Sequence, residues 1–156
     1  MTPRVFIRLL GPASLLVALL ATGATAGDSL FGGRVGLYTH RDQPYFGLEA
    51  VVPIGGGFAV NPNAEYVRLG DTQEFTFNAD LQYEVPFRRR FLGWAGAGLG
   101  LLSSHPDGPG EPSTKDGVAN LFLGIGLDTG IGMPYLTAKY VTKKDPQFLI
   151  ALGMRF

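Results

Sequence analysis

The chain has 156 residues, enough for one domain, and its 13 basic and 13 acidic side chains give a formal net charge of zero. This balance argues against a nucleic-acid partner, which requires a basic surplus, and the lack of cysteine excludes disulfides, thiolate chemistry and cysteine-ligated zinc. Charged residues make up only 17% of the chain, against about 25% in an average globular protein. The composition is therefore unusual for a soluble domain.

The beginning of the chain has the pattern of a secretory signal peptide. Arg4 and Arg8 form a basic start, an apolar stretch follows, and the ATA at residues 24–26 supplies the small-x-small cleavage pattern. An uncleaved anchor helix is the alternative, but the apolar stretch is shorter than the roughly 20 residues that span a bilayer. We predict an exported protein with a signal peptide at residues 1–26 and one domain at residues 27–156.

Beyond the signal peptide, the dominant pattern is alternation of apolar and polar residues. Residues 75–85, FTFNADLQYEV, are apolar at every odd position and polar at every even one. Successive side chains of a β-strand point to opposite faces. This segment therefore separates an apolar environment from a hydrophilic one.

The same pattern predicts eight strands separated by Gly, Pro and charged turn residues. They span residues 31–39, 44–52, 58–69, 75–85, 91–102, 118–127, 133–142 and 147–156. Most are about ten residues long, which a tilted strand needs to cross a bilayer. Pro62 falls inside the third strand, where a bulge would reverse the alternation. We predict an all-β, eight-stranded, antiparallel up-and-down transmembrane barrel.

The connections between these strands are unequal in length. The longest spans residues 103–117, whereas PIGGG, PFRRR and DTGIG, at residues 53–57, 86–90 and 128–132, are short turns. If the first strand runs outward from the periplasm, the three short turns are periplasmic and the long loop is external, as in outer-membrane barrels.

Aromatic residues on the apolar face fall at two heights on this topology. Near the outer rim are Phe46, Tyr66, Phe75, Phe77, Tyr140 and Phe148, and near the periplasmic rim are Phe31, Phe58, Tyr83, Phe87, Phe91 and Phe156. The residues between them are aliphatic or small. Two aromatic girdles around an aliphatic band are typical of proteins that span a bilayer.

The chain therefore resembles the small eight-stranded outer-membrane barrels of Gram-negative bacteria, the OmpA-like or opacity-protein-like class. The most specific element is the C-terminal strand, whose apolar face consists of Phe148, Ile150, Leu152, Met154 and Phe156. In that family such a strand is the signal recognised by the barrel-assembly machinery. The resemblance implies a monomeric, non-enzymatic protein of the outer membrane, in contact with its lipids and lipopolysaccharide, with no cofactor.

Polar residues fall on the inward face of the predicted strands. The ionisable ones are Arg34, Glu49, Glu65, Asp80, Glu84, Lys139 and Arg155. An eight-stranded barrel leaves an interior just wide enough for side chains, and buried charges must be paired. We predict an internal network of ion pairs, in which the three cations have Glu49, Asp80 and Glu84 as natural partners. A narrow ion path gated by exchange of these partners is the alternative.

Two further functions remain open. Lipid A deacylases have the same architecture with a His-x-Ser-Asn motif on one strand. Here the two histidines, His40 and His105, fall in predicted external loops. Ser103 and Ser104 directly precede His105, which is the wrong place and order for that motif. A flexible loop is a poor base for a catalytic triad, so we predict no catalytic residue. A soluble, lipocalin-like binder of an apolar ligand would require the apolar face to turn inward.

Two groups of basic residues fall outside the strands. Arg88, Arg89 and Arg90 lie in a predicted periplasmic turn, next to anionic phospholipid headgroups. Lys143, Lys144 and Arg41 would meet lipopolysaccharide phosphates at the outer rim.

Overall fold

The computed structural model describes residues 29–40, 42–106, 112–143 and 145–156. The predicted signal peptide lies outside these residues. Among the described residues, no helix is long and apolar enough to cross a membrane.

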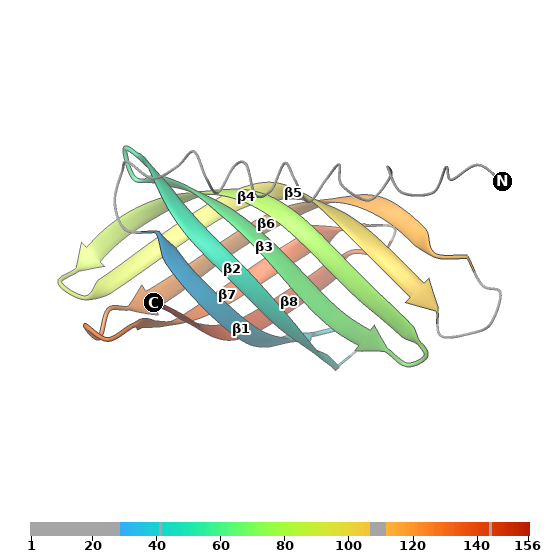
Figure 1. Cartoon of the computed structure of the whole chain (residues 1–156). Coiled ribbons are helices and arrows are strands. Elements are labelled where there is room, and N and C mark those ends of the chain that lie inside the picture. The colour runs from blue at the N-terminus through green and yellow to red at the C-terminus, as the bar shows by residue number, and fades with distance from the viewer. Residues whose placement is uncertain (1–28, 41, 107–111, 144) are drawn as a thin grey trace, which may run out of the picture.

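Eight antiparallel strands form one closed barrel, in which each strand pairs with the next and the last pairs with the first (Figure 1). They are β1 (Leu30–Tyr38), β2 (Gln43–Gly55), β3 (Phe58–Leu69), β4 (Thr72–Arg88), β5 (Phe91–Pro106), β6 (Thr114–Leu127), β7 (Met133–Thr142) and β8 (Gln147–Arg155). The predicted up-and-down barrel is confirmed.

The closure between β1 and β8 leaves no open sheet edge. The paired residues run from Gly32 with Arg155 to Tyr38 with Leu149. Beyond them, the Phe31 N–H donates to the Phe156 carbonyl at 3.0 Å and the Phe156 N–H donates to the Phe31 carbonyl at 2.8 Å. Closure satisfies the backbone polar groups that an open edge would expose to lipid.

The two ends of the barrel differ. We call the end that holds Leu30 and Arg155 the terminal end, at the left of Figure 1, and the opposite end the loop end. The terminal end has the tight turns of β2–β3, β4–β5 and β6–β7. The β2–β3 turn depends on glycine, because Gly55, Gly56 and Gly57 have φ values of 100°, 64° and 82°, a region that other residues rarely adopt.

The predicted loop at residues 103–117 is largely wrong, because β5 and β6 extend into it. Ser103 pairs with Lys115 and Ser104 pairs with Thr114, and β5 is also held by β4 as far as Pro106 opposite Thr72. Both faces of these strand ends are polar, so the sequence shows no alternation there that would predict a strand. Pro62 causes no bulge either, because β3 keeps one register against β4 on both sides of it.

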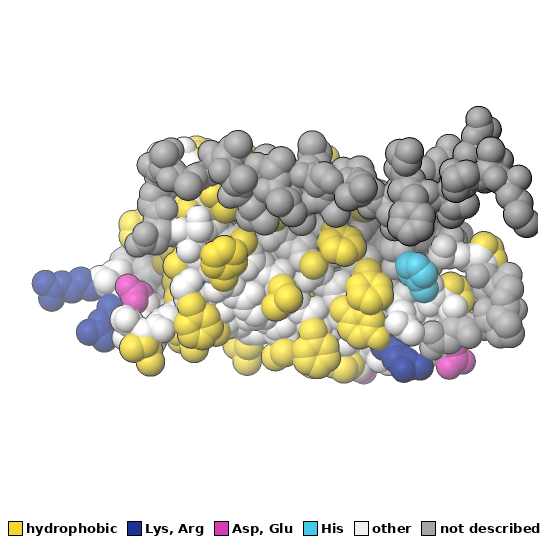
Figure 2. Space-filling model, viewed as in Figure 1, with side chains coloured by type: hydrophobic (Ala, Val, Ile, Leu, Met, Phe, Trp, Pro, Cys, Tyr) yellow, Lys and Arg dark blue, Asp and Glu magenta, His cyan; other side chains and the backbone are white. Residues whose placement is uncertain are grey.

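The two faces of the wall have opposite polarity. Leu48 and Leu99 on the outer face are each 71% exposed, whereas Gln82 on the inner face is fully buried. Figure 2 shows hydrophobic side chains over the middle of the wall, with charged side chains gathered at its two ends. The lipocalin-like alternative, which required an apolar interior and a polar exterior, is therefore wrong.

The aromatic side chains assigned to the two rims lie on the outer face near the ends of the strands. At the terminal end, the Phe58 and Tyr83 ring centroids lie 4.9 Å apart. Towards the loop end, Tyr66 and Phe75 lie 4.8 Å apart. These cross-strand pairs bring aromatic rings together at both heights, where a bilayer would have its interfaces.

Candidate functional site in the barrel lumen

A chain of buried ion pairs crosses the lumen, beginning at Arg34 on β1. Its guanidinium contacts Glu49 on β2, with Nη1 and Oε2 3.2 Å apart, and Glu65 on β3, with Nη2 and Oε1 2.7 Å apart. All three side chains are buried. Arg34 therefore links two carboxylates that lie on neighbouring strands.

Each of these carboxylates has a second cation. Arg155 on β8 donates to Glu49 through Nε at 2.8 Å and Nη2 at 3.3 Å, and its guanidinium lies 4.3 Å from the Trp94 ring centroid. The Lys139 ammonium on β7 lies 3.1 Å from both oxygens of Glu65. The order Arg155, Glu49, Arg34, Glu65, Lys139 is thus a continuous series of alternating charges, in which each ion contacts at least one ion of opposite sign.

Asp80 is a further buried carboxylate, but its contacts differ from those predicted. Its carboxylate accepts hydrogen bonds from Asn63 at 2.8 Å and from Asn120 at 3.2 Å, and among the described residues it forms no ion pair. Glu84 is half-buried and accepts from Gln82 at 2.7 Å, again without an ion-pair partner in the described part of the chain. The predicted pairing of cations with Asp80 and Glu84 is therefore wrong, because amides occupy the positions next to both carboxylates.

Glycines on the inner face of β5 make room for this network. A Cβ atom at Gly98 would overlap Asp80 Oδ1 and would lie 2.7 Å from the Ala79 carbonyl oxygen. A Cβ atom at Gly100 would likewise overlap Asn78 Oδ1. The polar side chains of β4 consequently fill the space that side chains on β5 would otherwise occupy.

Apolar clusters close the lumen on both sides of the polar network. The loop-end cluster contains Tyr38, Tyr45, Val67, Leu102, Val118, Val141, Leu149 and Ala151. The terminal-end cluster contains Trp94, Met133 and Tyr135, with Leu30, Leu92 and Phe122 packed against it. The sequence did not predict that apolar residues close the lumen. An apolar residue that points inward interrupts the alternation and gives no signal of its own.

Very little space remains inside. A cavity of about 10 Å³ lies within the network and is bordered by Arg34, Asp80, Lys139 and Arg155. This volume is about that needed for one water molecule. The described side chains therefore leave little free space in the lumen at the level of the network.

One ion pair covers the loop-end cluster. Lys143, between β7 and β8, contacts Glu74 on β4, with Nζ and Oε2 3.3 Å apart. The same ammonium lies 5.9 Å from the Tyr38 ring centroid. This contact spans the mouth of the barrel and joins residues 69 positions apart in sequence, a distance over which sequence spacing predicts no pairing.

The structure places the candidate serines and histidines in two regions of the barrel. Ser103 and His105 lie on the outer face of β5 rather than in a loop, which corrects the sequence-based placement. Ser104 points inward and donates to Glu74 at 3.5 Å, and His40 lies in the β1–β2 turn. Within the described residues no hydrogen bond joins a serine to a histidine, and no group of three His, Asp or Glu residues is placed to hold a metal ion.

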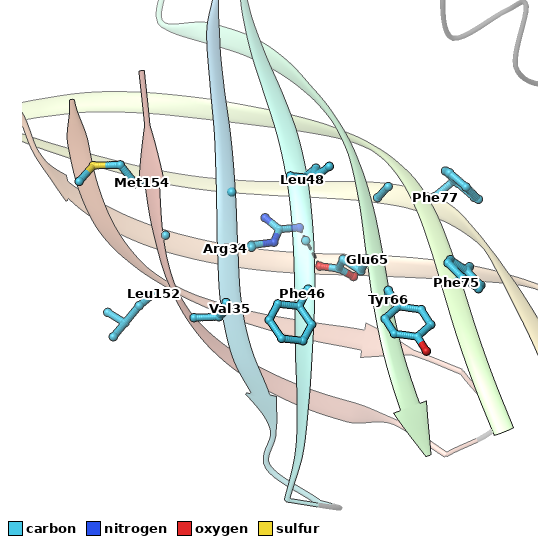
Figure 3. Close-up of a pocket in the computed structure, with 14 residues that line it drawn as sticks. Arg34, Val35, Phe46, Leu48, Glu65, Tyr66, Phe75, Phe77, Leu152 and Met154 are labelled. Carbon is cyan, nitrogen blue, oxygen red and sulfur yellow. Dashed lines mark hydrogen bonds and ion pairs between the residues drawn. The ribbon is translucent and has the colours of Figure 1, made fainter. Parts of the chain in front are cut away.

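A shallow apolar groove of about 770 Å³ lies on the outer wall (Figure 3). Gly33 and Ala64 leave it hollow, and Phe46, Leu48 and Phe77 are among the side chains that border it. The ion pair of Arg34 and Glu65 lies directly behind this part of the wall, as the dashed line in Figure 3 shows.

The side chains of the predicted assembly signal lie on the outer face of β8. Phe148, Ile150, Leu152, Met154 and Phe156 are all exposed, by 36% to 68%. The strand therefore presents an unbroken apolar face, and recognition of that face by an assembly machinery stays a prediction.

No family model and no curated protein matches the chain, but solved structures do. The N-terminal β-barrel domain of Pseudomonas aeruginosa OprF aligns with a TM-score of 0.63 and 11% identity over 82% of this chain and 96% of that one. Neisserial surface protein A aligns with a TM-score of 0.63 and 12% identity over 81% and 92%. The Yersinia pestis outer membrane protein Ail, in a phospholipid bilayer nanodisc, aligns with a TM-score of 0.56 and 11% identity over 84% and 100%.

An enzyme has the same fold. The outer membrane enzyme PagL aligns with a TM-score of 0.51 and 13% identity over 81% of this chain and 98% of that one. At such identities the likeness extends to the fold and not to the activity. Together with the closed barrel of eight antiparallel strands, these alignments show that the chain has the fold of the small eight-stranded outer-membrane β-barrels.

Proposed function

We propose that the protein is a non-enzymatic barrel of the Gram-negative outer membrane, with a closed lumen and a structural or surface role. The observation that carries this proposal is the filled interior, in which a compensated ion network lies between two apolar clusters. The described side chains leave little space there for a ligand. They give the wall a rigid core of fixed polar contacts instead.

The outer face supports residence in a bilayer. The exposed aliphatic side chains between the aromatic rims would be costly in water and are favourable in lipid. In this proposal the terminal end faces the periplasm and the loop end faces outward, towards lipopolysaccharide. The signal peptide provides export, the apolar face of β8 is recognised by the barrel-assembly machinery, and the protein works as a monomer.

Conductance of the refolded protein in planar bilayers tests the closed lumen. We expect no single-channel events over a range of voltage and pH, because opening a path would require separation of buried ion pairs and displacement of both apolar clusters. Reproducible single-channel events from the wild-type protein would contradict the closed-lumen proposal.

A narrow gated pore is the second candidate, and one observation favours it. Glu49 and Glu65 each contact two cations, and Arg34 is shared between them. Exchange of partners could therefore move Arg34 without leaving a carboxylate unpaired. Single-channel events that disappear in Arg34→Met would support this candidate.

The enzymatic alternative has a direct chemical test. Ser103 and His105 share the outer face of β5 near the loop end, although no carboxylate bonds to the His105 ring among the described residues. Mass spectra of lipid A from cells with and without the expressed protein should be identical if the protein is not a deacylase. Loss of an acyl chain on expression, abolished by Ser103→Ala, would establish the enzyme.

A further inference from the structure

The turn between β4 and β5 concentrates positive charge at the terminal end. We call Arg88, Arg89 and Arg90 the arginine turn; all three side chains are exposed. Phe87 and Phe91 flank it on the outer face, with stacked rings whose centroids lie 6.4 Å apart at an interplanar angle of 15°. The stacked pair fixes the end of the hairpin, so the three guanidinium groups are presented directly beyond an aromatic girdle.

The neighbouring β6–β7 turn is tied to the arginine turn. The Asp128 N–H donates to the Arg90 carbonyl at 2.7 Å. Ile131, at the tip of the β6–β7 turn, is 88% exposed. A depression of about 580 Å³ lies between the two turns and is lined by the arginine turn, Phe91, Asp128 and Ile131, among others. The depression thus combines guanidinium groups with apolar side chains.

The charge of the arginine turn is not compensated within the described residues. None of its three side chains forms an ion pair there, and Asp128, the one acidic side chain among the residues that line the depression, accepts a hydrogen bond from the Gly130 N–H at 2.8 Å. The loop end has the opposite balance. Among the described residues there, acidic side chains outnumber basic ones. The basic residues are Arg68, Lys115 and Lys143, and the acidic residues are Asp42, Asp71, Glu74, Asp116 and Asp145. In the part of the chain that the structure describes, the terminal end is therefore cationic and the loop end is acidic.

We infer that the arginine turn and its depression bind the phosphate of an anionic phospholipid in the leaflet at the terminal end. Guanidinium groups bind phosphate oxygens in a bidentate manner, and basic segments at a membrane surface attract anionic lipids. A membrane lipid fits better than a soluble phosphate, because Ile131, Phe87 and Phe91 border the cations and match the boundary between headgroup and acyl chain. The inference rests on the membrane location in the proposed function, but not on a closed lumen.

Native mass spectrometry of the folded protein tests this site. The mature chain is reconstituted in nanodiscs of equal parts phosphatidylglycerol and phosphatidylcholine, and the lipids retained after release are counted. We compare the wild type with R89Q/R90Q and with R68Q/K115Q, which removes the same charge from the loop end. Heat-modifiable gel mobility verifies that each variant is folded, and the turn substitutions leave the barrel interior untouched.

The wild type should retain phosphatidylglycerol in preference to phosphatidylcholine, and the preference should weaken with added salt. Each basic residue at an anionic surface contributes about fivefold in binding, so R89Q/R90Q, which removes two of them, should reduce the preference by up to about 25-fold, whereas R68Q/K115Q should retain it. A folded wild type without any preference, or an equal reduction in both variants, would overturn the site. A wild type that folds in water and not in lipid would instead refute the membrane location itself.

Discussion

At the scale of single residues, Glu49 is the central carboxylate of the lumen. It contacts Arg34, Arg155 and Asn61, so Glu49→Gln would leave Arg155 buried without its only carboxylate among the described residues. Removal of one partner from a buried ion pair costs about 3–5 kcal/mol. We expect a loss of this size in the free energy of unfolding, measured by urea denaturation in phospholipid vesicles.

Glu84→Gln is the matched control, because Glu84 is half-buried and contacts an amide rather than a cation. Its substitution should cost less than about 1 kcal/mol, in the range of a single neutral hydrogen bond. Equal losses in the two variants would mean that the ion network contributes no more to stability than an ordinary polar contact.

Gly98 provides a second test of how tightly the lumen is filled. In Gly98→Ala the new methyl group would overlap Asp80 Oδ1 and the β4 backbone, and overpacking costs about 1–3 kcal/mol. Gly117→Ala is the control, because its Cβ meets nothing within 4 Å. We expect a lower unfolding temperature for Gly98→Ala only. The unfolding temperature is measured as the temperature at which the gel mobility of the protein changes. Equal temperatures would show that the inner face of β5 has free space.

At the scale of elements, alternation predicted the strand interiors but not the strand ends. Beyond the lipid band both faces of β5 and β6 are polar, so the pattern ended near Leu102 although the hydrogen-bonded ladder continues to Pro106. Alternation also gives no orientation for Trp94, because its neighbours are glycine and alanine. The structure places it inside, against Tyr135.

Alternation along each strand predicted which polar side chains point inward. It did not predict which of these side chains contact one another. Lys139 contacts Glu65, which lies 74 residues away and on a strand that does not pair with β7. Such contacts depend on the tilt and stagger of the closed sheet, and these are properties of the whole barrel rather than of any strand. The same holds for Asn120, a hydrogen-bond partner of Asp80 that lies on β6, a strand that does not pair with β4.

The strand β8 combines closure of the barrel with the predicted assembly signal, and Phe156→Ala separates the two. The substitution keeps the backbone hydrogen bonds to Phe31 and removes an exposed ring, so refolded stability should change by less than about 1 kcal/mol. If the ring is part of the assembly signal, the amount of protein in the outer-membrane fraction should fall several-fold. Phe87→Ala removes a comparably exposed ring at the same end, and equal amounts of both variants would exclude a special role for Phe156.

At the scale of the whole molecule, the wall is apolar outside and polar inside, the opposite of a soluble barrel. This arrangement predicts how the cost of a charged substitution varies with depth in the bilayer. Leu99 and Ser103 lie on the same face of β5, with Leu99 in the middle of the strand and Ser103 near the loop end. An arginine on the lipid face costs about 2–4 kcal/mol at the midplane and 0–1 kcal/mol near the interface. In phospholipid vesicles, Leu99→Arg should therefore lower the free energy of unfolding by several times as much as Ser103→Arg. In a water-exposed wall both substitutions would be nearly neutral, so equal and small effects would contradict membrane insertion, whereas a graded loss would locate the bilayer along the barrel axis.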